Sequence, residues 1–539
     1  MNAFQRKSLY AALAGAGALG VAATADAVQV NPNGLGQVLI YPYYTVQSDG
    51  AGNAYNSLLS VVNTDSSAKA IKIRFLEGRR SQEVLDFNVF LSKFDVWTAA
   101  IEPTSAGGAK ITTADNSCTI PVNTLLKAGV NFVNFAYAGD GGGDGLDRTR
   151  EGYVEIIEMA TYTSTNCTSI VVTHVNGVPE CQGAKHPLND NSAKTDASSS
   201  AGGLFGGMTL INVGTGTDYT EDAVALERFN QVSGGALYFN AGSIAPALDT
   251  VDAAEGSTVY GALNDGGVNA GVTTFNSDGT IAFTANYQPD GYIGVFHSPW
   301  DGTQCGATGT KADACLPVDA VSAALMHTQV INEYVLDAAT KSGTDWVITF
   351  PTKRFYVSTG TGSAIKLFQK NFNKTDFSCD DVIINIWDRE ETTVTTPQSF
   401  SPPQPGGKPT SLCFEANVLT FNGSYVLGLG PIVDGTSTIG NRASLTTTFE
   451  HGWLDMHLSS ASSVSYHKLF NTNTTHIYEA SDVTTGQTVT YQGLPVVGFA
   501  VQSFTNGTLQ ITNPIVGAPS TALSNYGGNF VHKYVTLIN

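Results

Sequence analysis

Short runs in which apolar and polar residues alternate recur along almost the whole chain. Clear examples lie at 71–75, 86–91, 153–158, 346–350 and 382–387. Because successive side chains of a β-strand point to opposite faces, this period of two predicts strands with one face in a core. Clusters of Gly, Asn, Asp and Ser separate the runs and suit tight turns. The clearest predicted hairpin has its turn at Asn506-Gly507, between runs at 501–504 and 508–511.

Helical patterns are few and short. The best covers 317–327, with a proline at its start and Asp319 in its first turn, and the second covers 220–229. Parallel sheets need a helix between successive strands, and most of those helices are missing. The sequence therefore predicts an all-β protein, an antiparallel β-sandwich of immunoglobulin-like or jelly-roll type, with long loops and one or two short helices.

Residues 1–27 have the features of a secretory signal peptide. Arg6 and Lys7 precede an uncharged stretch of small apolar residues at 11–23, and Ala25-Asp26-Ala27 fits an A-x-A cleavage site. A membrane anchor is the alternative, but the stretch is shorter than the roughly 20 residues that cross a bilayer. We expect a secreted protein that is extracellular or on the cell surface, otherwise periplasmic, of a Gram-negative bacterium. No membrane-spanning segment is expected after cleavage.

Glycine-, serine- and asparagine-rich stretches at 189–207 and 252–276 indicate soft boundaries. We expect an N-terminal β-sandwich at 28–215, a middle β-rich region with short helices at 216–357, and a C-terminal β-sandwich at 358–539. The middle region is alternatively an insertion into one large sandwich.

The chain is acidic: 27 Lys and Arg stand against 46 Asp and Glu, a formal net charge of −19. Binding to a phosphate backbone needs a basic face, so nucleic acid is excluded as an expected partner. Charged residues make up only 14% of the chain, against about 25% in an average soluble domain.

Seven cysteines occur and none forms a C-x-x-C motif, which argues against zinc-ribbon, thioredoxin-like and c-type haem sites. Disulfides are expected in an oxidising compartment. We predict the pairs Cys305–Cys315, Cys379–Cys413 and Cys167–Cys181. Cys118 is then left over, either free and buried, paired differently, or linked to another chain.

Two groups of residues are candidate metal ligands. If 451–457 forms a strand, His451, Trp453, Asp455 and His457 share one face, and Asp455 with His457 forms half of a site for Zn²⁺ or Cu²⁺. His467 or His476 would complete it. Asp140, Asp144 and Asp147 lie in a glycine-rich loop of a kind that binds Ca²⁺. The alternatives are a solvated strand face and an ordinary acidic loop.

Aromatic residues near turns, at 41–44 and at His297 and Trp300, are candidate stacking platforms for sugars. Packing of these rings in the core is the alternative and the more common arrangement.

Signatures of catalysis are absent from the sequence: it has no G-x-S-x-G, H-E-x-x-H or P-loop motif. A Ser/His/Asp triad or a carboxylate pair would leave no such local pattern. We expect an exported, non-enzymatic structural or adhesive protein of a bacterial cell surface or extracellular matrix, which acts through self-association or attachment to cell-surface components. The stretch 28–46 is a candidate for pairing with a sheet edge. The alternatives are a secreted glycan-binding or polysaccharide-active protein and an exported metal-binding protein.

Overall fold

The computed structural model describes residues 28–49, 52–137, 140, 142–181, 188–227, 229, 236–250, 274–275, 281–282, 318–357, 367–369, 377–393, 411–429, 442–459, 467–471, 477–479, 482–483, 489–512 and 519–537. The expected signal peptide, the Cys305–Cys315 pair, His297, Trp300 and His476 lie outside the described residues.

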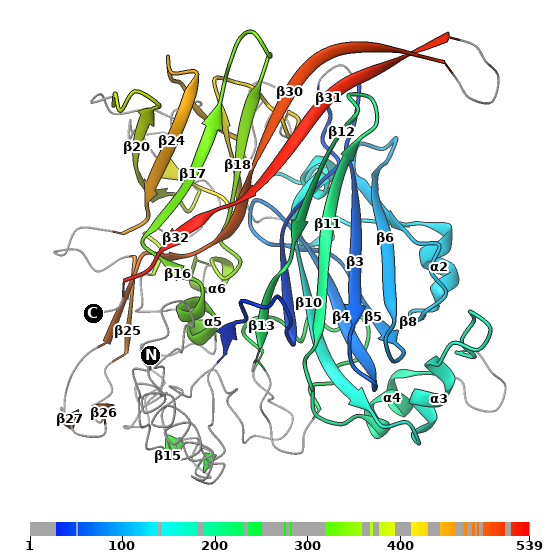
Figure 1. The fold of residues 1–539 in the computed structure, drawn as a ribbon. Coiled ribbons are helices and arrows are strands. Elements are labelled where there is room, and N and C mark those ends of the chain that lie inside the picture. The colour runs from blue at the N-terminus through cyan, green and yellow to red at the C-terminus, as the bar shows by residue number, and fades with distance from the viewer. Residues whose placement is uncertain are drawn as a thin grey trace, which may run out of the picture.

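Two antiparallel sheets pack face to face in the N-terminal part of the chain (Figure 1). The seven-stranded sheet has the order β1-β13-β2-β10-β4-β5-β8 and the six-stranded sheet the order β12-β11-β3-β6-β7-β9. The first contains β1 (Gln29–Val30), β13 (Val224–Glu227), β2 (Val38–Thr45), β10 (Glu151–Tyr162), β4 (Ala68–Glu77), β5 (Glu83–Leu91) and β8 (Cys118–Ile120). The second contains β12 (Thr217–Asp222), β11 (Leu204–Asn212), β3 (Asn56–Asn63), β6 (Val96–Pro103), β7 (Ala109–Thr112) and β9 (Val130–Asn131).

Two further sheets form the C-terminal part, with the orders β20-β24-β17-β32 and β23-β22-β18-β30-β31. Every pairing in them is antiparallel except that of β22 with β23. The strands are β20 (Ile383–Asp388), β24 (His451–His457), β17 (Gln329–Val335), β32 (Lys533–Val535), β23 (Arg442–Leu445), β22 (Ala416–Phe421), β18 (Gly343–Thr349), β30 (Val497–Thr512) and β31 (Pro519–Val531).

Smaller elements complete the described fold. Five two-stranded sheets are β14 (Thr274–Phe275) with β15 (Ile281–Ala282), β16 (Met326–His327) with β29 (Leu494–Pro495), β19 (Asp380–Asp381) with β21 (Ser411–Leu412), β25 (Lys468–Asn471) with β28 (Val489–Gln492), and β26 (Ile477–Glu479) with β27 (Asp482–Val483). The helices are α2 (Asn123–Ala128), α3 (Cys167–Val172), α4 (Asp190–Asp196), α5 (Val318–Ala324) and α6 (Arg354–Val357), with 3₁₀ turns η1 (Phe135–Tyr137) and η2 (Leu146–Arg150). The prediction of an all-β, sandwich-like fold is confirmed, with five short helices rather than one or two.

The two parts share their hydrophobic cores. Val347, Val418 and Phe499 of the C-terminal sheets belong to the cluster that fills the N-terminal sandwich. Val38 and Ile40 of β2 belong to the cluster that α5 and the C-terminal strands form. Strand β2 therefore contributes one face to each core, which explains why all eight of its residues are buried.

The region expected at 216–357 contributes to both parts. Strands β12 and β13 lie in the N-terminal sheets, whereas β17 and β18 lie in the C-terminal sheets. The helix predicted at 317–327 is present as α5. The helix predicted at 220–229 is wrong, because the residues of β12 alternate between buried and exposed with the period of a strand.

The hairpin turn predicted at Asn506-Gly507 is also wrong. Strand β30 continues through these residues, and its register with β31 shifts between Thr505 and Thr508. Gly507 has a φ of 85°, which the left-handed conformation of a bulge residue requires. The Asn-Gly pair thus forms a β-bulge inside a long two-stranded ribbon.

Candidate functional site

The residues predicted to bind metal at 451–457 lie on strand β24 as expected. Leu454 and Met456 point into a core, whereas His457 is partly exposed. His457 Nε2 lies 2.6 Å from Asp455 Oδ2. His467 lies elsewhere, with its Nε2 at 3.1 Å from Asp380 Oδ1. In the part of the chain that the structure describes, Asp455 and His457 thus form a pair that no third ligand completes.

The acidic glycine-rich loop is bound by arginines. Both oxygens of Asp140 accept hydrogen bonds from Arg148, at 2.9 and 2.8 Å. Asp147 lies 3.4 Å from Arg79, and the backbone carbonyl of Asp144 accepts from Asn134. Although burial raises the pKa of Asp140, the hydrogen bonds from Arg148 and from the Gly142 N–H leave it below the usual value. The three aspartates do not converge on one point among the described residues.

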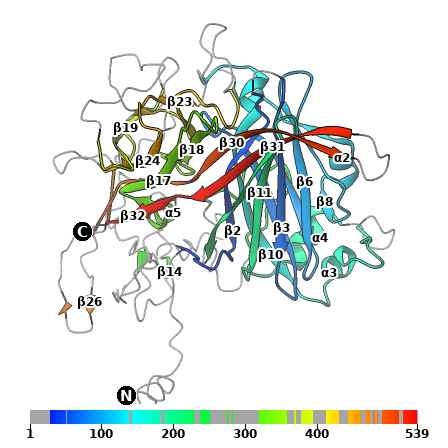
Figure 2. The same cartoon turned by 45° about the horizontal axis from the view of Figure 1, so that its top comes forward.

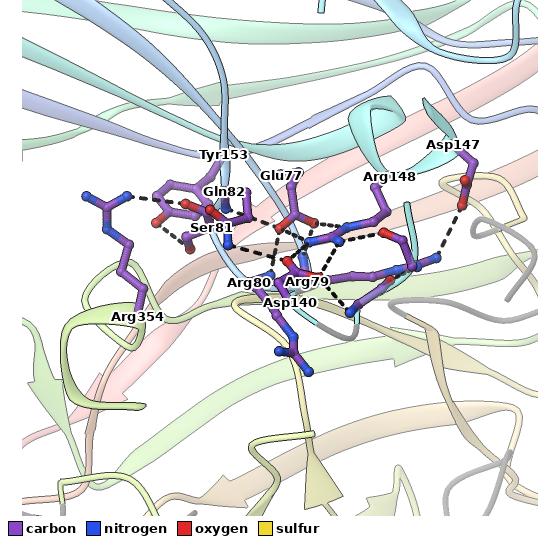
Figure 3. Close-up of polar contacts among 12 residues, drawn as sticks. Glu77, Arg79, Arg80, Ser81, Gln82, Asp140, Asp147, Arg148, Tyr153 and Arg354 are labelled. Atoms are coloured by element: carbon purple, nitrogen blue, oxygen red, sulfur yellow. Dashed lines mark hydrogen bonds and ion pairs between the residues drawn. The ribbon is translucent and has the colours of Figure 1, made fainter. Parts of the chain in front are cut away.

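Arg148 is the centre of a buried network (Figure 3). Its guanidinium lies between Asp140 and Glu77, with Nη2 at 2.9 Å from Glu77 Oε1, and stacks on the Tyr137 ring with Cζ at 3.9 Å from the centroid. Glu77 also accepts the backbone N–H groups of Arg79 and Arg80 at 2.8 Å. The turn after β4 is therefore held from inside by the Glu77 carboxylate, which pairs with Arg148 and accepts two backbone N–H groups.

The same turn contacts the C-terminal part of the chain. Tyr153 Oη lies 2.8 Å from Ser81 Oγ and 3.2 Å from the carbonyl oxygen of Pro351. Arg354 Nη1 donates to the carbonyl oxygen of Ser81 at 3.2 Å, as Figure 3 shows. We call the residues around this turn, Glu77 to Gln82 with Arg148, Tyr153 and Arg354, the buried junction. It joins the two parts of the molecule through polar contacts that the sequence did not indicate.

Buried charges also line the outer face of β4. Arg74 lies 2.7 Å from Glu155, and Lys72 lies 2.7 Å from Asp86 and donates to the carbonyl oxygen of Ser243. Alternation of apolar and cationic residues at 71–75 predicted a strand with one face in a core, and it does not indicate that the cationic face is buried as well. Both cations are nevertheless buried, and the carbonyl oxygens of Asn240 and Ser243, in the segment 236–250, accept hydrogen bonds from Lys72.

The cysteine pairing differs from the prediction at one pair. A disulfide joins Cys379 to Cys413, the pair predicted from the sequence. Cys181 is bonded to Cys118 and not to Cys167, with Cα atoms 5.7 Å apart. Cys167 is an exposed free thiol at the first residue of helix α3.

Most of the aromatic candidates are core residues. Tyr41, Tyr43 and Tyr44 are fully buried on β2. A different aromatic pair is accessible: Trp387 of β20 stacks on Trp453 of β24 with ring centroids 4.1 Å apart, and Trp453 is 39% exposed.

A long ribbon runs from the C-terminal part over one end of the N-terminal sandwich, and its tip rises above that end in the view of Figure 1 (Figures 1 and 2). The last pair between β30 and β18 is Ser503 with Gly343. Beyond it, β30 and β31 pair only with each other, from Phe504–Tyr526 to Thr512–Pro519. We call this segment, residues 504–512 and 519–526, the arm. Asn525 and Asn529 hold its base to the N-terminal sandwich by donating to the carbonyl oxygens of Thr215 and Thr220.

The arm contains no charged residue. No Asp, Glu, Lys or Arg occurs between Asp482 and Lys533, in a chain of net charge −19. Natural edge strands usually carry charges or prolines that prevent pairing with other chains, and of these the arm has only Pro519, at the start of β31. The charge-free run is visible in the sequence, but only the structure shows that it forms a two-stranded ribbon. The two observations together make the arm the candidate functional site.

Comparisons with protein-family models, with curated proteins and with solved structures find no match to this chain. None of the described helices has the length and apolar character needed to cross a membrane.

Proposed function

We propose that this chain is an exported, non-enzymatic structural or adhesive protein of a bacterial cell surface or extracellular matrix, and that it acts through self-association. The observation that carries the proposal is the arm, a charge-free two-stranded ribbon that projects from an otherwise acidic body.

Backbone chemistry supports pairing at the arm. Beyond Thr505, whose backbone N–H donates to the carbonyl oxygen of Thr340, β30 and β31 pair with no other strand among the described residues. An isolated two-stranded ribbon is marginally stable in water, so additional strand pairing would stabilise it. Addition of a strand at such an edge is a common mode of recognition between proteins.

Electrostatics favours the same surface. Copies of a chain with a net charge of −19 repel each other at long range. The repulsion is weakest where the approaching surfaces have no charge, and the tip of the arm stands above the end of the N-terminal sandwich (Figure 1). The anchored base transmits any force on the arm to the core, since Phe499 and Val501 of β30 are buried.

Two lysines in the arm test this proposal. We expect the purified full chain to form dimers or larger assemblies by light scattering, and Thr521→Lys with Leu523→Lys to make it monomeric, because unpaired charges oppose strand addition. Val96→Lys with Thr98→Lys is the matched control: both positions are exposed on β6, an inner strand. A monomeric wild-type chain, or an arm variant that assembles like the control, would refute the proposal.

The Trp387–Trp453 pair favours glycan binding as a second candidate function. Flat apolar ring faces suit the C–H faces of pyranose sugars, and Asn385, two residues before Trp387 on β20 and only partly buried, offers hydrogen bonds. A glycan array checks this function. Binding that is lost in Trp453→Ala and kept in Phe135→Ala, at another exposed aromatic residue, supports it; an array without binding removes it.

A further inference from the structure

Three side chains with metal-binding groups converge where β17 ends and β24 begins. Val335, the last residue of β17, pairs with His451, the first residue of β24. The backbone N–H of Leu336 donates to the carbonyl oxygen of Glu450 at 2.7 Å. One carboxylate oxygen of Asp337, one of Glu450 and one imidazole nitrogen of His451 lie within 4.8 Å of one another. Strand pairing, and not a flexible loop alone, thus sets their spacing.

The surroundings orient one of these ligands and leave the other two available. The Asp337 carboxylate accepts the backbone N–H groups of Ala339 and Thr340 at 3.1 and 3.2 Å, and the Thr340 hydroxyl at 2.8 Å. Within the described chain, the side chains of Glu450 and His451 make no hydrogen bond. Both are at least partly exposed, so they can turn toward a shared ion.

Charge provides a separate argument. Two carboxylates at this distance repel each other, and a cation between them removes the repulsion. Arg389, whose charge also acts on Glu450, already forms a close pair with Glu390 at 2.7 Å. The position between Asp337 and Glu450 is therefore left to a different cation.

We propose that Asp337, Glu450 and His451 bind a divalent first-row transition-metal ion such as Zn²⁺. One imidazole and two carboxylates are suitable ligands for Zn²⁺, which is held at roughly 2.0–2.2 Å from its oxygen and nitrogen ligands. Rotation of the Glu450 and His451 side chains toward Asp337 would bring the three atoms, now within 4.8 Å of one another, to that distance. Three protein ligands leave a further position for water. Ca²⁺ fits less well, because it takes about six to eight oxygen ligands.

The site differs from the Asp455–His457 pair and lies beside the arm. His451 and His457 are at opposite ends of β24. The carbonyl oxygen of Thr340, in the loop that orients Asp337, accepts the backbone N–H of Thr505 in β30 at 3.0 Å. A bound ion would therefore stabilise the loop on which the base of the arm rests.

Calorimetric titration of the full chain with ZnCl₂ tests the proposal. We expect saturable binding of about one equivalent, weakened about tenfold or more by His451→Gln, because a lost ligand removes a coordination bond. His457→Gln, at the other end of the same strand, is the matched control and is expected to bind like the wild type. Circular dichroism of each variant establishes that the fold is retained.

Trp453 offers an independent measurement, because it lies two residues from His451 and Cu²⁺ quenches indole fluorescence at short range. Quenching that saturates in the wild type and in His457→Gln, but not in His451→Gln, supports the site. The proposal is wrong if the wild type shows no saturable binding, if His451→Gln binds like the wild type, or if His457→Gln abolishes binding.

Discussion

Arg442 Nη1 lies 2.7 Å from Glu151 Oε2, although 291 residues separate them in the chain. Arg442 begins β23 in the C-terminal part, and Glu151 begins β10 in the N-terminal sandwich. Both side chains are buried, and Arg442 also donates to the carbonyl oxygens of Leu427 and Gly428. Burial alone would lower the pKa of Arg442, but the Glu151 carboxylate raises it. Arg442 therefore remains charged, and its contact with Glu151 joins the two parts of the molecule.

Breaking this pair is expected to be costly. Arg442→Met leaves a buried, unpaired Glu151 and should lower the free energy of unfolding by about 3–5 kcal/mol, measured by denaturant titration. Adding Glu151→Gln should restore part of the loss, because the uncompensated charge disappears. Arg389→Met is the control: its pair with Glu390 is exposed, so no measurable change is expected. Equal effects of Arg442→Met and Arg389→Met would show that the buried pair does not hold the parts together.

The second prediction concerns pH. Burial raises the pKa of Glu415 to about 8, although Lys353 and Arg354 lower it. An unfolded glutamate has a pKa of about 4.3, so unfolding releases a proton between these values. The contribution of Glu415 to stability is therefore complete below about pH 4.3 and is lost as the pH rises toward 8.

Glu415→Gln removes this dependence. We expect the difference in unfolding free energy, wild type minus variant, to fall between about pH 5 and pH 8 and to level off above. Denaturant titrations at several pH values measure it, with Glu390→Gln as an exposed control. Parallel curves for wild type and Glu415→Gln would contradict the raised pKa.

The third prediction distinguishes the disulfide-bonded cysteines Cys118 and Cys181 from the free cysteine Cys167. The Cys118–Cys181 bond has a sequence separation of 63, and a loop of this length corresponds to about 4 kcal/mol of stabilisation in the chain-entropy model. We expect Cys118→Ala to lower the unfolding temperature clearly and Cys167→Ala to leave it unchanged. Peptide mapping without reductant should find Cys118 linked to Cys181 and Cys167 alkylated. A Cys167–Cys181 peptide would overturn this pairing.

The fourth prediction concerns calcium. Because Arg148 occupies both oxygens of Asp140, we expect neither added CaCl₂ nor EGTA to shift the unfolding temperature. Arg148→Met should lower that temperature, since Glu77 and Asp140 lose their partner. A rise in unfolding temperature with CaCl₂ would instead favour the calcium site predicted from the sequence.

The sequence was informative where local pattern decides structure. Alternation predicted the strands and the all-β fold, and the proline and Asp319 at 317–327 predicted α5. Prediction from the sequence failed where contacts between distant segments determine which residues are buried. Lys72 and Arg74 resemble residues of a solvated face, and only the chain that covers them makes that face buried.

The candidate sites show the same limit. Asn506-Gly507 favours a turn locally, yet pairing with β31 makes it a bulge. Asp140 offers the oxygens that Ca²⁺ prefers, but Arg148 from the same loop takes them. Asp337 and Glu450 are far apart in sequence, so only the pairing of β17 with β24 brings them together.

The sharing of cores between the two parts has a consequence for biogenesis. Ile40 and Ala500 belong to one hydrophobic cluster, and β30 is an inner strand of its sheet. If the chain crosses a membrane from its N-terminus onward, β2 emerges long before β30. The apolar surface of β2 that packs in the shared cluster stays uncovered until β30 has also crossed. The native state then forms only after translocation is complete, and a chain cut short before β30 would be a substrate for proteases and chaperones.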